Sequence, residues 1–152
     1  MPFEASYGNI EALPYHDNSI DYLLSESVTA FTNLSKSLSE FNRVLKKGGV
    51  LIAVEVCQDG SLADKDVKTL KDFYQFRHLL TKGEWQEQLE HHSFGEISLK
   101  ARPTDLQGDA SQTAIPTDRL TVEQEQTLLK HMDLSLEYQF RLHPYLIRCT
   151  KQ

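Results

Sequence analysis

The sequence predicts one α/β domain over residues 1–152, and three observations support this fold class. Residues 20–25 (IDYLLS) form a short apolar run between polar segments, which is typical of a buried strand. A helical pattern follows over residues 33–46, and a second apolar run, VLIAVEV, covers residues 50–56. Strand, helix and strand in this order predict a parallel pair with a right-handed crossover.

The helix between the two strands has the clearest pattern in the chain. Its apolar residues fall on one face, at positions 34, 38, 41 and 45. Thr32 or Asn33 can cap its start, because their side-chain oxygens accept from unpaired backbone N–H groups. Gly48 and Gly49 are predicted to end it, since glycine readily takes the positive φ of a C-cap.

The second half of the sequence predicts further helices and strands. Two T-x-x-E/Q capping boxes, Thr81 with Glu84 and Thr121 with Gln124, mark helix starts. We expect a loop over residues 102–116, and a loop-and-helix insertion over residues 102–134 before the last strand. The other expected elements are a helix near 68–80 and strands at 96–101 and within 135–150.

The composition excludes several classes of function. The chain has 16 Lys and Arg against 22 Asp and Glu, a net charge of -6, so nucleic acid is not an expected partner. No apolar run approaches the roughly 18 residues of a membrane span, and the N-terminus lacks a secretory signal. Cys57 and Cys149 lie in apolar stretches of the sequence, so we expect both to be reduced and buried in the core, with a disulfide as the minor alternative. Reduced cysteines indicate a cytoplasmic protein.

Two segments resemble class I S-adenosylmethionine-dependent methyltransferases of the type that acts on small molecules. The family pattern is G-D-A-x-x-L-P-F-x-D-x-S-F-D, followed by E-x-x-R-V-L-K-P-G-G and a strand. Here the first segment reads GNIEALPYHDNSID (residues 8–21) and the second reads EFNRVLKKGG (residues 40–49). The segment around His92, Ser93 and Phe94 also resembles the turn before the family's sixth strand, and YLIRCTK resembles its seventh.

The resemblance implies a partial Rossmann-like methyltransferase sheet with strand order 4-5-7-6, the last strand antiparallel. The family's glycine-rich cofactor loop and its ribose-binding acid have no counterpart here, so the chain is expected to be the C-terminal part of the fold. Glycine is needed in that loop because the backbone approaches the cofactor closely. The implied cofactor is S-adenosylmethionine, and we expect the isolated chain to hold it incompletely.

Four residues match positions that contact the cofactor in the family. Asn9 stands where an acid usually binds the adenine amino group, and Ile10 would offer its backbone N–H to the ring. Ser25 and Glu26 follow the first strand and would border the methionine part. The ends of parallel strands are where such sheets bind ligands.

Ser27 and Glu55 are the candidate substrate-binding residues. Glu26 is also a candidate general base, with a solvated loop acid as the alternative, and Glu55 is alternatively an end-of-strand hydrogen-bonding group. No catalytic residue is assigned. The six histidines have no metal-ligand spacing, so no metal site is predicted.

Three kinds of function remain open from the sequence. The first is a small-molecule methyltransferase lacking its N-terminal half. The second is a non-enzymatic interaction or dimerisation module derived from one. The third, less favoured, is an unrelated small α/β binding domain. Without the family's first strands, residues 20–25 would form an open sheet edge, which favours pairing with another chain. We therefore expect a homodimer through this edge, or a partner chain that supplies the missing half.

Overall fold

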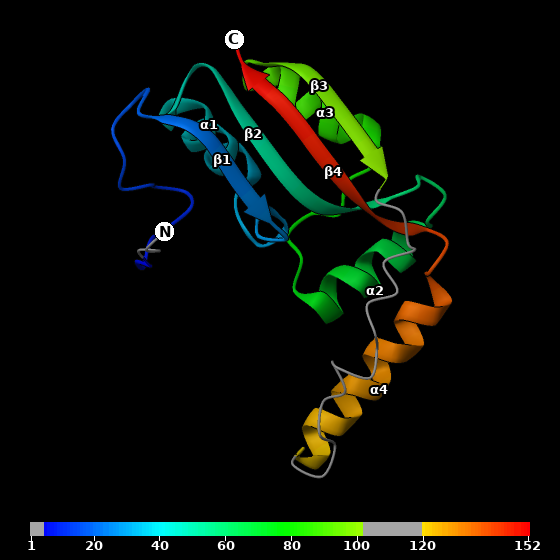
Figure 1. Ribbon diagram of the computed structural model, residues 1–152. Helices are drawn as coiled ribbons and strands as arrows, with labels where there is room; N and C mark the ends of the chain where they lie inside the picture. The colour runs from blue at the N-terminus through cyan, green and yellow to red at the C-terminus, as the bar shows by residue number, and fades with distance from the viewer. Residues whose placement is uncertain (1–4, 102–119) are drawn as a thin grey trace, which may run out of the picture.

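The computed structural model describes residues 5–101 and 120–152 of the chain. Its centre is a four-stranded sheet in the order β1-β2-β4-β3 (Figure 1). The strands are β1 (Ile20–Glu26), β2 (Leu45–Gln58), β3 (Phe94–Ala101) and β4 (Leu142–Lys151). β1 and β2 are parallel, whereas β4 runs antiparallel to both of its neighbours. The predicted α/β class, strand order and antiparallel last strand are therefore confirmed.

Helix α1 (Leu34–Val44) makes the crossover from β1 to β2. Of the two expected caps, Asn33 is the one used, because its side chain accepts a hydrogen bond from the backbone N–H of Lys36. The predicted apolar face packs onto the sheet, with Leu38 and Phe41 buried. Burial of this face stabilises the helix more than its intrinsic propensity does.

The helix ends two residues earlier than predicted, and the glycine pair has a different role. Leu45 already has extended backbone and pairs with Ile20 of β1, so α1 stops at Val44. Gly48 has φ +75°, and a Cβ on Gly49 would lie 2.8 Å from the carbonyl oxygen of Lys46. The two glycines thus allow an irregular bend inside β2 rather than capping the helix.

Three more helices follow, and both predicted capping boxes are present. They are α2 (Asp64–Tyr74), α3 (Lys82–His91) and α4 (Val122–Glu137). Thr81 with Glu84 opens α3, and Thr121 with Gln124 opens α4. The helix expected over residues 68–80 was placed too late in the chain, because α2 begins at Asp64 and ends where Gln75 takes a left-handed φ of 61°.

The expected loop over residues 102–116 lies outside the described residues. The insertion expected over residues 102–134 is therefore seen only from residue 120. Its helix α4 continues beyond that boundary to Glu137. In the described part of the chain, no helix has the length and apolar character needed to cross a membrane.

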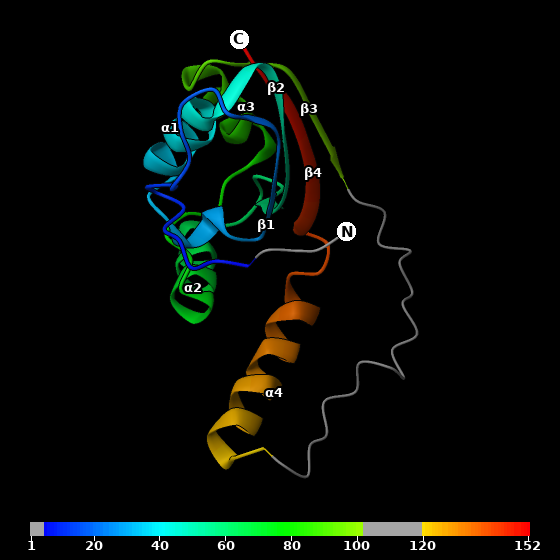
Figure 2. The same ribbon diagram turned by 60° about the vertical axis from the view of Figure 1, so that its left-hand side comes forward.

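Helices α1 and α3 cover one face of the sheet, as the turned view shows (Figure 2). Leu51 and Ala53 of β2 and Ile147 of β4 point to this face and are buried with Trp85 of α3. Leu24 of β1 lies at the β1 edge and is 74% exposed. Both cysteines are free and buried within the covered core, as predicted.

A second, smaller core joins α2 to α4 beyond the end of the sheet. Leu70 and Leu79 pack there against Leu134 and Tyr138 of α4. The Tyr138 hydroxyl also donates a hydrogen bond to Asp66 of α2, at 3.2 Å. These contacts fix the C-terminal half of α4, its upper half in Figure 1, against α2 below the sheet.

Candidate functional site

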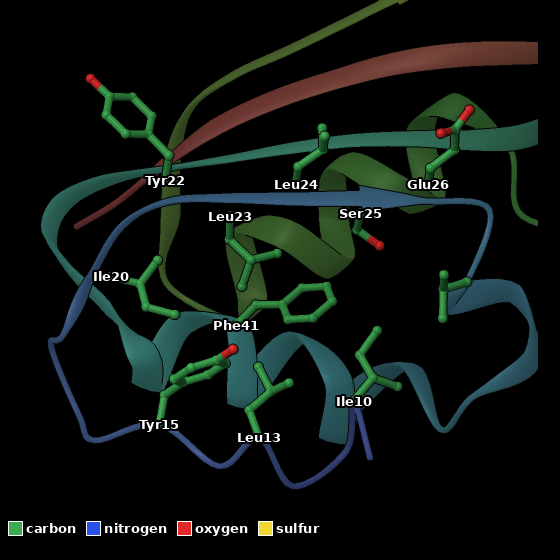
Figure 3. Close-up of a pocket in the computed structure, with 11 residues that line it drawn as sticks. Ile10, Leu13, Tyr15, Ile20, Tyr22, Leu23, Leu24, Ser25, Glu26 and Phe41 are labelled. Carbon is green, nitrogen blue, oxygen red and sulfur yellow. The ribbon is translucent and has the colours of Figure 1, made fainter. Parts of the chain in front are cut away.

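A cavity of about 340 Å³ lies beside β1, between this strand, the loop over residues 10–15 and helix α1 (Figure 3). Its walls are apolar along most of their length and polar near the end of β1. The lining residues are Ile10, Leu13, Tyr15, Ile20, Tyr22, Leu23, Leu24, Ser25, Glu26, Val28 and Phe41. The cavity is in the lower part of the size range of small-molecule sites.

The loop wall of the cavity is held by two side chains of α1. Glu40 accepts a hydrogen bond from the backbone N–H of Leu13 at 2.7 Å. Arg43 donates to the carbonyl oxygens of Leu13 and Tyr15, at 3.1 and 2.8 Å, and forms ion pairs with Glu40 and Asp17. The Arg43 hydrogen bond also lowers the pKa of the Glu40 carboxyl. Charge-assisted hydrogen bonds within the chain therefore hold this loop in place without a ligand.

Asn9 and Ile10 precede this loop and differ in their exposure. Asn9 is exposed, and its side-chain oxygen accepts from the backbone N–H of Glu11 at 2.9 Å. Its backbone oxygen accepts from Ala12, also at 2.9 Å, which closes a tight turn. Ile10 is half-buried and lines the cavity. The turn thus places Ile10 at the wall and leaves Asn9 at the rim.

Ser25 supplies the polar group that faces into the cavity. Its side chain is 6% exposed, and Figure 3 shows its hydroxyl pointing from β1 into the space between the strand and α1. The hydroxyl has no hydrogen-bond partner among the described residues. A buried polar group without a partner is costly, and such groups are rare unless a ligand or water completes them.

Glu26 and Ser27 end the strand on the exposed side. Glu26 lines the cavity and is exposed, and its carboxylate points away from Ser25 in Figure 3. The backbone N–H of Ser27 donates a hydrogen bond to the carbonyl oxygen of Val54. Ser27 also has a left-handed φ of 53°, so the chain turns sharply at this residue. The turn leads directly into the short helix η1 (Thr29–Phe31).

Glu55 lies behind this turn rather than in the cavity wall. It is 1% exposed and accepts a long hydrogen bond of 3.4 Å from the backbone N–H of Thr29. Burial raises the pKa of its carboxyl, and the contacts with Thr29 oppose that shift only in part. His78 contacts the same turn, with its Nε2 2.9 Å from the carbonyl oxygen of Thr29. Glu55 and His78 therefore brace the turn from inside.

The structure brings three of the six predicted residues, Ile10, Ser25 and Glu26, into one cavity wall. Sequence reasoning did not select Leu13, Tyr15 or Val28, although the L-P-Y segment contained two of them. The sequence signal for these residues was that the L-P-Y segment and the E-x-x-R segment occur together. Glu40 and Arg43 of the second segment hydrogen-bond the backbone of the first. Among the described residues, no group of three or more His, Cys, Asp or Glu side chains is placed to hold a metal ion.

Comparison with known proteins gives concordant matches. A family model described as a methyltransferase domain matches residues 3–129. The uncharacterized methyltransferase YodH of Bacillus subtilis is 33% identical over 145 residues, which cover 91% of this chain and 61% of YodH. The mitochondrial 2-methoxy-6-polyprenyl-1,4-benzoquinol methylase of Arabidopsis thaliana is 35% identical over 78 residues, covering 51% of this chain and 26% of that protein. The chain thus spans less than two thirds of the length of these relatives.

Solved structures show the same fold at low sequence identity. Phosphoethanolamine N-methyltransferase 2 of Haemonchus contortus, in complex with S-adenosyl-L-methionine, matches with a TM-score of 0.76 and 15% identity, over 94% of this chain and 36% of that one. The [4+2]-cyclase SpnF matches with a TM-score of 0.71 and 19% identity, over 96% and 54%. The cyclase shows that this fold alone does not fix the reaction. The family model, which matches most of the chain, does show the family: this chain belongs to the methyltransferase-domain family.

Proposed function

We propose that this domain binds S-adenosylmethionine at the carboxyl end of β1 and serves methyl transfer to a small-molecule acceptor. The observation that carries the proposal is the cavity beside β1, with the unpaired hydroxyl of Ser25 inside it, in a chain of the methyltransferase-domain family. Ligands of open α/β sheets bind outside the carboxyl ends of the strands, and this cavity runs along β1 and reaches its carboxyl end at Ser25 and Glu26.

The lining chemistry fits the cofactor's adenosyl group. Ile10 and Leu13 offer an apolar wall for a flat base, and the Ser25 hydroxyl offers a hydrogen bond. Asn9 at the rim and Glu26 at the strand end are the further candidate contacts, and Ser27 is the candidate nearest to the acceptor. Glu55 does not line the cavity, so it would affect acceptor binding only by holding the turn at Thr29 in place.

S-adenosylmethionine, when bound, supplies the methyl group on a sulfonium centre. The work left to the chain is to hold the acceptor in line with that group and to exclude water. The Arg43 and Glu40 clamp keeps the loop wall in place, and Glu55 supports the opposite wall. A site with this role needs ordered walls more than a general acid or base.

Titration calorimetry with S-adenosylhomocysteine tests the proposal. We expect saturable binding with a dissociation constant below about 1 mM, which corresponds to roughly 4 kcal/mol, because the isolated chain lacks the glycine-rich loop of the family. Ile10→Trp should abolish binding because it fills the cavity, whereas Leu146→Trp, at an exposed position on β4, should leave it unchanged. Absence of binding at millimolar ligand would overturn the proposal for this chain.

We further propose that the β1 edge pairs with another chain, either a second copy or a partner that completes the sheet. β1 is an edge strand of the described sheet, and Tyr22 and Leu24 on it are each 74% exposed. In a two-fold dimer the two β1 strands would run antiparallel. This open edge also supports the second candidate function, an assembly module without catalysis. The buried free thiols of Cys57 and Cys149 support a reducing, cytoplasmic location.

Analytical ultracentrifugation tests the edge pairing. We expect a dimer at micromolar concentration, and Tyr22→Lys with Leu24→Lys should convert it to monomer, because lysines block edge pairing. A wild-type protein that sediments as a monomer at this concentration would rule out the homodimer and leave only the partner chain.

A further inference from the structure

Helix α4 carries a row of exposed apolar side chains outside the β1 site. Val122, Leu129, Met132 and Leu136 follow one another at intervals of seven, three and four residues, and each is more than half exposed. At 3.6 residues per turn, these intervals place the four side chains on one side of the helix. Leu134, the one buried residue of α4, falls on the opposite side and packs in the second core with α2. We call the four exposed residues the α4 stripe.

Few buried side chains hold α4 to the rest of the chain. The helix spans 16 residues, and Leu134 anchors it together with Tyr138 just after its end. Figure 1 shows α4 extending away from the sheet, and nearly all of its residues are exposed. A helix of this length is only marginally stable in water by itself, because helices gain most of their stability by packing an apolar face. The α4 stripe is such a face, and it is exposed to solvent.

The spacing of the stripe is typical of an interface between two helices. Apolar residues that alternate at intervals of three and four form the seam of a coiled coil, where side chains of one helix fit between those of the other. Contiguous exposed apolar patches on a soluble protein commonly mark interaction sites. A second helix with the same stripe would cover this one along most of its length.

Charges at the two ends of α4 favour a second copy in the antiparallel direction. Glu125 lies in the first turn, on the same side as the stripe, and Arg141 is exposed in the turn that follows the helix. An antiparallel copy brings the Glu125 end of each helix against the Arg141 end of the other, whereas a parallel copy brings like charges together. The helix dipoles also attract each other only in the antiparallel arrangement.

The register of an antiparallel pair follows from the stripe itself. With a two-fold axis beside Met132, Leu129 of each helix packs against Leu136 of the other, and every contact occurs twice. Asp133 follows Met132 at the edge of the seam, so its two copies come close to each other at the axis. This pair of like charges weakens the interface slightly and gives the register a signature that can be tested.

We propose that the α4 stripe is a homodimer interface, in which α4 of one copy packs antiparallel against α4 of a second copy. The interface involves neither the β1 cavity nor the β1 edge, so it goes beyond the proposed function and does not depend on it. A chain that self-associates through both α4 and β1 assembles beyond a dimer, which sedimentation resolves.

Analytical ultracentrifugation of the full chain at micromolar concentration tests the apolar seam. We expect a dimer whose dissociation constant rises at least about a hundredfold in Leu129→Lys, because each dimer loses two buried leucines. Thr127→Lys is the matched control, since Thr127 is also exposed but lies on the side of α4 away from the stripe. It should leave the dissociation constant unchanged.

Charge exchange tests the antiparallel direction. Glu125→Arg and Arg141→Glu should each weaken the dimer roughly fivefold at low salt, because each places like charges at the helix ends. The combined variant restores opposite charges only in an antiparallel pair, so it should recover the wild-type dissociation constant. Asp133→Asn removes the repulsion at the axis and should tighten the dimer about twofold.

Three results would overturn the interface. They are a wild-type chain that stays monomeric at this concentration, a dimer that Leu129→Lys leaves intact, and equal weakening by Leu129→Lys and Thr127→Lys. A dimer that dissociates only in the variant with Tyr22→Lys and Leu24→Lys would assign self-association to the β1 edge instead. Failure of the combined charge variant to recover would overturn the antiparallel direction. A stripe covered by a different polypeptide would leave the wild-type chain monomeric, which is the first of the three results.

Discussion

Two buried serines of this domain differ in whether the side-chain hydroxyl has a hydrogen-bond partner. Ser25 is 6% exposed and its hydroxyl has no partner among the described residues. Ser37 is 0% exposed, and its hydroxyl donates to the Thr32 hydroxyl at 2.8 Å, which in turn donates to the carbonyl of Thr29. We predict that Ser25→Ala stabilises the ligand-free domain and that Ser37→Ala destabilises it.

The magnitudes follow from the hydrogen-bond inventory of each site. A buried, unsatisfied polar group costs about 1–3 kcal/mol, and we take the lower end for Ser25 because its hydroxyl faces a cavity rather than close-packed atoms. Loss of the Ser37 hydrogen bond costs about 1 kcal/mol. The two variants should thus differ by about 2 kcal/mol in free energy of unfolding, or about 4–8 °C in melting temperature for a domain of this size.

Urea unfolding followed by tryptophan fluorescence measures the difference, since Trp85 is buried in the same core. The same two variants are then titrated with S-adenosylhomocysteine. We expect Ser25→Ala to bind more weakly than wild type and Ser37→Ala to bind equally well. A Ser25→Ala variant that loses as much stability as Ser37→Ala would refute the reasoning, because its hydroxyl would then be satisfied within the fold.

Three further perturbations test other parts of the site. Burial raises the folded-state pKa of Glu55 above its ordinary value of 4.5, so wild-type stability should fall as pH rises through that folded pKa. Glu55→Gln lacks this titration, and its stability relative to wild type should increase over the same pH interval in urea melts; a constant difference would contradict the assignment. Arg43→Met should speed hydrogen exchange at the Leu13 amide while α1 stays protected, because the loop loses its clamp. Burial raises the pKa of Cys57 and Cys149 to about 12, so both thiols should resist Ellman's reagent until the domain unfolds.

Much of the fold could be predicted because local signals agreed with one another. The stripe on α1, the Asn33 cap and the two apolar strands all indicated the same β1-α1-β2 unit. The two capping boxes, at Thr81 and Thr121, fixed the starts of α3 and α4 within one residue. In these segments the pattern of each element and its tertiary packing favour the same conformation.

The remaining features depend on tertiary contacts that a single sequence does not display. Residues 45–49 read as a helix end followed by glycines, but pairing of Leu45 with Ile20 draws them into β2. The left-handed Gln75 carries none of the usual Gly or Asn signal for a helix end. Glu55 could be recognised as an unusual acid in a strand, whereas its contact with Thr29 depends on how η1 folds over the end of β2.

The family motif and the site geometry have a common physical origin. The segment L-P-Y and the helix segment E-x-x-R are separated by more than twenty residues, yet Glu40 and Arg43 bind the backbone of Leu13 and Tyr15 directly. Residues of the two motifs also form the cavity: Leu13 and Tyr15 from the loop, and Phe41 from between Glu40 and Arg43. The residues that identify the family therefore hold the wall of the candidate site, while Ser25, which the motif does not contain, supplies its polar contact. Substitutions in the motif should therefore act on the order of the loop, and substitutions at Ser25 on the affinity for the ligand.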